Sequence, residues 1–199
     1  MFANQEKAPF WIVVASPFVI ILLGFLTATL FSSFIAEWAW VPLALIYWTL
    51  MGIFIWKFKG KLPLHKWFKR SEKAPLWITL TLLIGSFPLT ILLSSYQLFD
   101  SMLLVLLWLL FACVNPWFEE FYWRGVLLDR LLEKWPVSLA IGFTTALFVV
   151  SHPLMWGVFS YANQSYHLYL YLAVAGIVWA ITYLKTRSLR VVIFFSYHR

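Results

Sequence analysis

Charged residues are scarce in this sequence. Only 12% of its 199 residues are Asp, Glu, Lys or Arg, whereas 63% are hydrophobic and 21% aromatic, and the mean hydropathy is +0.84. A chain of this length with so few charges cannot cover a soluble core with polar surface. The composition therefore excludes an ordinary soluble globular protein and predicts a protein whose solvent is the lipid bilayer.

Cysteine is almost absent as well. The single cysteine, Cys113, lies in an apolar run, so an intramolecular disulfide is excluded and a packing role is expected. The sequence also lacks an H-E-x-x-H helix, the spacing that would point strongly to zinc. No serine or cysteine has a supporting base at a recognisable spacing, which argues against a serine or cysteine protease. Internal repeats and long linkers are missing too, so a single transmembrane domain over residues 1–199 is expected.

Long apolar runs fill most of the chain. A helix needs roughly 20 residues to cross the hydrocarbon, and the runs predict about seven spans, of which the last is incomplete. They cover residues 10–35, 38–56, 75–96, 101–134, 136–152 and 166–184, with the last one starting near Leu189. Pro116 is expected to kink the fourth span, because proline removes a helix hydrogen bond. The fold class predicted is an all-α polytopic membrane helical bundle.

The basic residues are distributed unevenly, and this predicts the topology. Cytoplasmic loops of membrane proteins collect Lys and Arg. With the N-terminus inside, the inner segments hold every Lys and Arg except Arg199; these segments are the N-terminus and residues 57–74, 124–134 and 185–190. The outer loops contain only Glu37 and Asp100 as charged residues. We therefore expect an integral multi-pass protein with a cytoplasmic N-terminus.

The net charge of +7 bears on partners and location. Because the basic residues gather at the ends of hydrophobic spans, they favour contact with anionic membrane lipid and argue against nucleic acid as a partner. The short chain lacks an organellar targeting segment, so a bacterial cytoplasmic membrane is the expected location.

Three ionisable residues interrupt the fourth span. Glu119, Glu120 and Arg124 lie in N-P-W-F-E-E-F-Y-W-R-G, residues 115–125, where an ionised group costs on the order of 3 kcal/mol or more and is rarely retained without a role. Residues four apart share a helix face, so Glu120 and Arg124 can pair, whereas Glu119 is rotated by about 100° and points elsewhere. One carboxylate is then left over. The alternative is a purely structural ion-pair cluster of all three residues.

A histidine on the next span lies at the same depth as Glu119. Counted from the turn near Trp135, Glu119 is 16 residues back and His152 is 17 residues forward. In an antiparallel hairpin both side chains then lie roughly 24 Å from the turn and can meet. Such a pair can activate water, with glutamate as general base and imidazole as polariser or metal ligand. A histidine that serves only packing at a span end is the alternative.

The same residues carry a resemblance to a known family. E-E-F-Y-W-R-G at 119–125 and F-V-V-S-H at 148–152, whose histidine lies 28 residues after the arginine, resemble the E-E-x-x-x-R and F-x-x-x-H motifs of type II CAAX prenyl endopeptidases. This is the CAAX protease and bacteriocin-processing group of intramembrane proteases. Residues 176–193 also resemble the family's run into its last motif. We therefore expect a CAAX-protease-like core over residues 101–199.

The resemblance implies an endopeptidase that cuts a peptide or protein substrate within or beside the membrane. Glu119 would activate the attacking water, Glu120 and Arg124 would hold the site in shape, and His152 would bind the water, a metal ion or the developing oxyanion. The family has been described both as metal-dependent and as glutamate-based. A divalent metal such as zinc on Glu119 and His152 therefore stays open, although two ligands fall short of the usual three. The sequence does not fix the oligomeric state.

The last family motif, H-x-x-x-N, differs in this chain. Aligned through Ser188 and Leu189, its histidine would fall at Ser196, whereas the histidine present is His198, about 200° further around a helix. Either the chain is a shortened form of a longer protein or its last motif is degenerate. His198 is a candidate catalytic residue, with an incidental terminal histidine as the alternative.

Two functional hypotheses follow. An intramembrane endopeptidase should have Glu119 and His152 facing one polar cavity that is reachable from the inner side. A catalytically inactive membrane scaffold, or a bacteriocin-immunity protein of the same fold, should have fully paired carboxylates and no cavity that joins them to His152.

Overall fold

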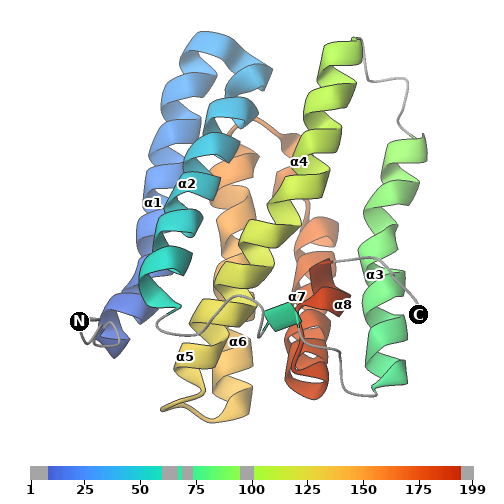
Figure 1. Ribbon diagram of the computed structural model, residues 1–199. Helices are drawn as coiled ribbons and strands as arrows, with labels where there is room; N and C mark the ends of the chain where they lie inside the picture. The colour runs from blue at the N-terminus through green and yellow to red at the C-terminus, as the bar shows by residue number, and fades with distance from the viewer. Residues whose placement is uncertain (1–8, 60–66, 69–73, 95–100, 194–199) are drawn as a thin grey trace, which may run out of the picture.

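The long helices stand side by side as a bundle (Figure 1). The computed structural model describes residues 9–59, 67–68, 74–94 and 101–193, with residues 37 and 87–94 described by their backbone alone. No strand occurs within these ranges. The all-α bundle predicted from composition and hydropathy is confirmed.

The helices of the described chain follow one another with short connections. The α-helices are α1 (Phe10–Ile35), α2 (Trp40–Phe58), α3 (Pro75–Ser94), α4 (Met102–Glu120), α5 (Asp129–Leu131), α6 (Val137–Met155), α7 (Tyr166–Thr186) and α8 (Arg190–Ile193). A π-helical segment, Phe121–Leu128, joins α4 to α5. Short 3₁₀ turns occupy Ala36–Ala39, Trp156–Val158 and Tyr161–Gln164.

Five helical stretches of the described chain are long and apolar enough to cross a membrane. They are α1, α2, the continuous stretch Met102–Leu131, the stretch Val137–Val158 and α7. The third predicted span corresponds to α3, which has 20 residues. Of the seventh predicted span only α8 falls within the described residues, and the remainder lies outside them. The protein is therefore an integral multi-pass membrane protein.

One predicted boundary differs in detail. α6 continues past His152, through Pro153, and ends at Met155. α4 also continues through Pro116 and stays α-helical to Glu120, and the departure from α-helical geometry begins at Phe121 with the π-helix. A π-helical turn inside a longer helix is rare and is often found at functional sites.

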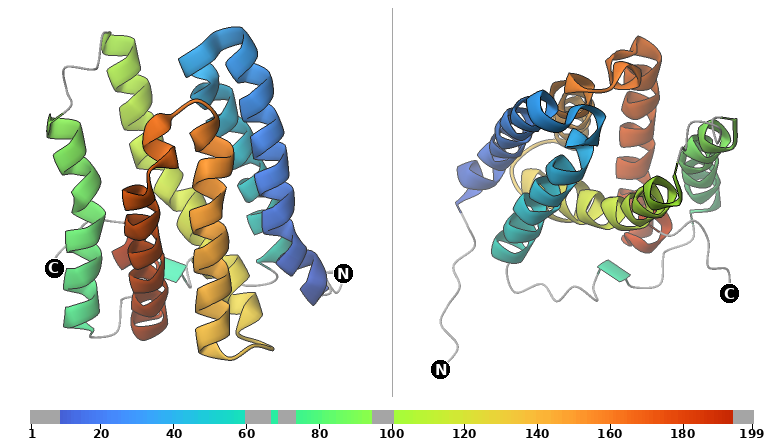
Figure 2. Two further views of the ribbon diagram at one scale, coloured as in Figure 1. Left: turned by 180° about the vertical axis from the view of Figure 1, so that it is seen from behind. Right: turned by 90° about the horizontal axis from the view of Figure 1, so that it is seen from above.

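The helices pack in a definite order around the core. α1 packs against α2 and α6, α6 against α7, and α2 against α4 and the π-helical segment. Figure 2 shows α3 at the edge of the bundle beside α7, where the Thr81 and Thr182 hydroxyls lie 2.7 Å apart in a hydrogen bond. Interhelical hydrogen bonds of this kind stabilise helix pairs in lipid. The largest fully buried side chains include Ile20, Leu43, Tyr47, Met51, Tyr122, Trp123, Leu127 and Phe148.

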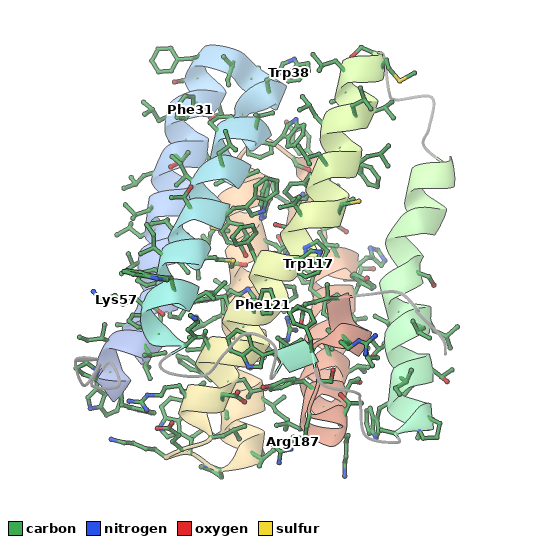
Figure 3. All side chains as sticks on the ribbon, in the orientation of Figure 1. Phe31, Trp38, Lys57, Trp117, Phe121 and Arg187 are labelled. Carbon is green, nitrogen blue, oxygen red and sulfur yellow. The ribbon has the colours of Figure 1, made fainter. Side chains whose placement is uncertain are left out.

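The two ends of the bundle differ in charge. Lys57 and Arg187 lie toward one end, and Phe31 and Trp38 lie at the other (Figure 3). We call the first the basic end; it also carries Arg130, Lys134 and Lys185 on and beside α5 and at the end of α7. We call the second the far end; it carries the α1–α2 turn, the start of α4 and the connection between α6 and α7.

Candidate active site

Glu119 closes α4 together with Glu120 and points toward α2. Its Oε1 accepts a hydrogen bond of 3.1 Å from the hydroxyl of Tyr47, a residue with no exposed surface. Glu119 itself is 9% exposed. Glu119, the carboxylate for which the sequence offers no cationic partner, therefore has a neutral partner in Tyr47. No ion pair of Glu119 is found among the described residues.

Glu120 points the other way and pairs with Arg124. Arg124 Nη1 lies 2.7 Å from Glu120 Oε1, and each side chain is 3% exposed. The guanidinium also lies 5.1 Å from the ring centre of Phe148 on α6 and 5.4 Å from that of Trp179 on α7. The ion pair expected from the four-residue spacing is present, and it ties the Glu119 segment to two further helices.

The π-helical segment packs closely against Trp67 and Phe68, which lie between α2 and α3. A Cβ atom added at Gly125 would lie 2.8 Å from Cζ2 of Trp67, so only glycine allows this approach. The Trp67 carbonyl in turn accepts a 2.8 Å hydrogen bond from the backbone N–H of Leu189. The glycine that follows the arginine of the motif thus permits dense packing directly beneath the site.

His152 presents one ring nitrogen to its own helix. Its Nδ1 lies 2.9 Å from the backbone carbonyl of Phe148. Since a carbonyl only accepts, Nδ1 of the neutral ring carries the proton and donates it to this bond. Nε2 is then the nitrogen with a free lone pair, and it can accept a hydrogen bond or bind a metal.

Glu119 and His152 line one cavity of about 690 Å³. Its walls are mostly aromatic, from Trp38, Trp40, Trp108, Phe111, Trp156 and Phe159, with polar groups from Ser101, Asn115, Ser160 and Asn163. The helical hairpin thus places both residues on the same cavity. Trp38, one of the lining residues, lies at the far end (Figure 3), and access from the inner side stays a prediction.

Comparison with known families agrees with this geometry. Residues 101–196 match the family model described as type II CAAX prenyl endopeptidase Rce1-like. Over these residues, which make up just under half of the chain, the protein is similar to the type II CAAX prenyl endopeptidase family. No curated protein and no solved structure matches the chain. The match confirms the resemblance carried by the two motifs, and the family is one of proteases.

Asn115 also lines this cavity, and the sequence analysis gave it no role. Its Oδ1 accepts a 2.9 Å hydrogen bond from Nε1 of Trp48, which stacks between Phe111 and Phe118. Because the indole N–H can only donate, the amide oxygen must face Trp48, and the amide NH₂ is directed away from it. The signal available in the sequence was the spacing: Asn115 precedes Glu119 by four residues and therefore shares its helix face.

The remaining predicted site residues and the metal stay predictions. His198 lies outside the described residues, and the family match ends two positions before it. Within the described ranges, no group of three or more His, Cys, Asp or Glu side chains could hold a metal ion. Glu119 and His152 alone do not make the three-ligand set that catalytic zinc usually has. The donor set that the described chain offers therefore does not fit zinc by itself.

Proposed function

We propose that this protein is an intramembrane endopeptidase in which Glu119 activates a water molecule for attack on a substrate peptide bond. One observation carries the proposal: a carboxylate without an ion-pair partner and an imidazole with a free nitrogen line the same cavity within the membrane-spanning bundle. Similarity to a protease family supports the same reaction class.

The arrangement can hold the attacking water from two sides. Glu119 accepts one of its hydrogens, and the free Nε2 of His152 accepts the other. Glu119 then takes the proton as general base while the water oxygen bonds to the carbonyl carbon. When the C–N bond of the tetrahedral intermediate breaks, Glu119 returns that proton to the leaving amine. Water and the peptide are therefore the only reactants consumed, and Glu119 ends the cycle in its starting protonation state.

Asn115 is placed to stabilise the developing oxyanion. Its amide oxygen is held by Trp48, so its N–H groups are fixed in direction before substrate arrives. A donor oriented in advance costs no reorganisation in the transition state, and removal of one such donor typically lowers the rate by about 10²–10³.

The Glu120–Arg124 pair has a supporting role in this proposal. It is fully enclosed, bridges α4 to α6 and α7, and does not line the cavity. Its contribution is to fix the backbone turn from which Glu119 projects.

The inactive alternative is less well supported. A scaffold or immunity protein that had lost catalysis should have both carboxylates paired and no space between them and His152. In this structure Glu119 borders a cavity that also reaches His152, and this favours the enzyme.

The experiment that tests the function compares peptides released from membranes that contain wild type, Glu119→Gln or His152→Ala. Loss of the general base should reduce product formation by about 10²–10⁴. Glu133→Gln is the matched control, since Glu133 is an exposed carboxylate of the basic end, where it pairs with Arg130. If Glu119→Gln is folded and releases the same products at the same rate, the enzyme proposal is wrong.

A further inference from the structure

The first half of the chain contributes to the candidate active site through α2. This helix lies beside α4 (Figure 1) and packs against both α4 and the π-helical segment. It lies outside residues 101–196, the part of the chain that the family model matches. The role of its residues must therefore be inferred from their contacts.

The buried face of α2 carries one polar side-chain atom. Its buried residues are Leu43, Ala44, Tyr47, Met51 and Ile55, and among them only Tyr47 has a polar group, its hydroxyl. The Tyr47 side chain has no exposed surface. A hydroxyl that leaves water for an apolar environment costs free energy unless it is hydrogen-bonded, and phenylalanine would fill the same space. The hydroxyl is therefore the feature of this position that packing alone does not explain.

The partner of this hydroxyl is the carboxylate of Glu119. The hydroxyl donates to Glu119 Oε1 at 3.1 Å. The Tyr47 ring is held independently of this bond, because it packs edge-on against Trp156, with ring centres 5.9 Å apart and ring planes at 87°. Packing thus fixes the position of the ring, and the ring fixes the direction from which the hydroxyl reaches Glu119.

This contact can orient the general base. Tyr47 does not line the cavity, so it can act on the reaction only through Glu119. We propose that Tyr47 is a positioning residue: its bond to Oε1 holds the carboxylate so that Oε2 accepts the hydrogen of the attacking water. Misplacement of a reacting group by 1 Å can lower a rate by about 10²-fold. This inference rests on the proposed function, in which Glu119 is the general base.

The next residue of α2 makes a similar contact one turn earlier on α4. Trp48 donates to Asn115 Oδ1 at 2.9 Å, and Asn115 precedes Glu119 by four residues. Two consecutive residues of α2 therefore hold two side chains on one face of α4. Both donors are neutral, so they orient their partners without placing a cation beside the base.

Removal of the Tyr47 hydroxyl tests the proposal. Tyr47→Phe keeps the ring that packs on Trp156 and removes only the donor. The substrate is the membrane peptide whose release is lost in Glu119→Gln, added at graded concentrations to purified protein in detergent. We expect kcat to fall by about 10- to 100-fold with KM within about twofold of wild type, because the base is misplaced while the cavity wall is unchanged. An unchanged kcat would overturn the proposal.

Tyr122→Phe is the matched control. Tyr122 also has no exposed surface, its hydroxyl lies 2.7 Å from Ser16 Oγ in a hydrogen bond, and it does not line the cavity. Each substitution removes one buried hydroxyl, so both should lower the unfolding temperature by similar amounts, whereas only Tyr47→Phe should lower kcat. Equal losses of kcat in the two variants would mean that the Tyr47 bond acts through stability alone, and the positioning role would be wrong.

Infrared spectroscopy tests the contact without turnover. The chain has only eight Asp and Glu residues, so the carboxylate band that is missing in Glu119→Gln can be assigned to Glu119. This band should shift in Tyr47→Phe and stay in place in Tyr122→Phe. 3-Fluorotyrosine at position 47 keeps the hydroxyl and nearly the same volume but donates more strongly, so it should shift the band in the opposite direction. A Glu119 band that neither change at position 47 moves would refute the proposal.

The outcomes separate this inference from the proposed function. If Glu119→Gln keeps full product formation, the proposed function is wrong and the positioning role is wrong with it. If Glu119→Gln abolishes product formation while Tyr47→Phe keeps the kcat of wild type, the function stands and only the inference about Tyr47 fails. In the Glu119→Gln background, Tyr47→Phe should lower the residual rate no further. A further loss there would show that the hydroxyl acts on another group, against the proposal.

Discussion

The two halves of the Met102–Leu131 span differ sharply in their surroundings. From Met102 to Phe118 every residue is exposed or half-buried, whereas the segment from Tyr122 to Leu128 is buried throughout. Glu119 and Glu120 stand at the boundary. One continuous helical stretch therefore forms the wall of a cavity in its first half and the floor of that cavity in its second half.

The difference shows how a membrane protein can set the depth of a reactive group. In the first half the helix is spaced from its neighbours by large rings, and polar atoms such as those of Asn115 face the cavity. In the second half Gly125 allows close approach, and the π-helical segment packs against α1, α2, α6 and α7. We call the first half of this span the upper half and the second half the lower half. Substitutions in the lower half should therefore reduce stability, and substitutions in the upper half should reduce activity.

The largest effect is expected in the lower half, from Arg124→Ala. The substitution leaves Glu120 as an uncompensated buried charge, and its Oε2 already lacks a hydrogen-bond partner among the described residues. Breaking a buried ion pair in this way costs about 3–5 kcal/mol. Unfolding in detergent should show this loss, and the double variant Glu120→Leu with Arg124→Met should recover most of it. A stable single variant would mean that the pair is not a structural anchor.

In the upper half, Asn115→Ala should lower kcat by about 10²–10³ with little change in KM, because the amide acts on the transition state. Asn163→Ala is the matched control: Asn163 lines the mouth of the same cavity, and its amide bonds Ser160 Oγ at 3.1 Å. We expect kcat of this control to stay near that of wild type. Equal losses in both variants, or a loss of folding in Asn115→Ala, would argue against an oxyanion role.

A third prediction compares two glycines. Gly125→Ala would place a methyl group 2.8 Å from Trp67, whereas a methyl group at Gly142 on α6 would meet no atom within 4 Å. Overpacking of this kind costs about 1–3 kcal/mol. Thermal unfolding should therefore separate the two variants, with Gly142→Ala close to wild type. Identical unfolding temperatures would show that the floor is looser than its contacts indicate.

The smallest effect is expected from Trp48→Phe. Phenylalanine keeps the stack with Phe111 and Phe118 but cannot donate to Asn115, so the amide loses its fixed orientation. We expect kcat to fall by about tenfold or less, which corresponds to roughly 1.4 kcal/mol. Combined with Asn115→Ala, the substitution should cause no further loss of kcat. If the reductions in kcat from the two substitutions add up in the double variant, Trp48 does not act through Asn115.

The sequence predicted the parts of the site that depend on local spacing. Glu120 and Arg124 pair because they are one helical turn apart, and Glu119 and His152 line one cavity because a tight hairpin turn sets the two helices side by side. The sequence gave no indication of the role proposed for Asn115, since the orientation of its amide depends on Trp48, which is 67 residues away. The direction of access stays a prediction, because charge placement indicates the cytoplasmic end without showing how side chains fill the bundle.

By itself, the amino-acid sequence determined that this chain is a helical membrane protein, and it located the carboxylates, arginine and histidine that resemble motifs of the family. Hydrophobicity and helical spacing act over a few turns, so these features can be derived without contacts between distant residues. Only the tertiary structure decided that Tyr47 is the partner of Glu119, that a buried layer lies beneath the pair, and that the cavity extends to the far end. These features arise where several helices meet, and the packing of side chains from distant parts of the chain determines which spaces stay open.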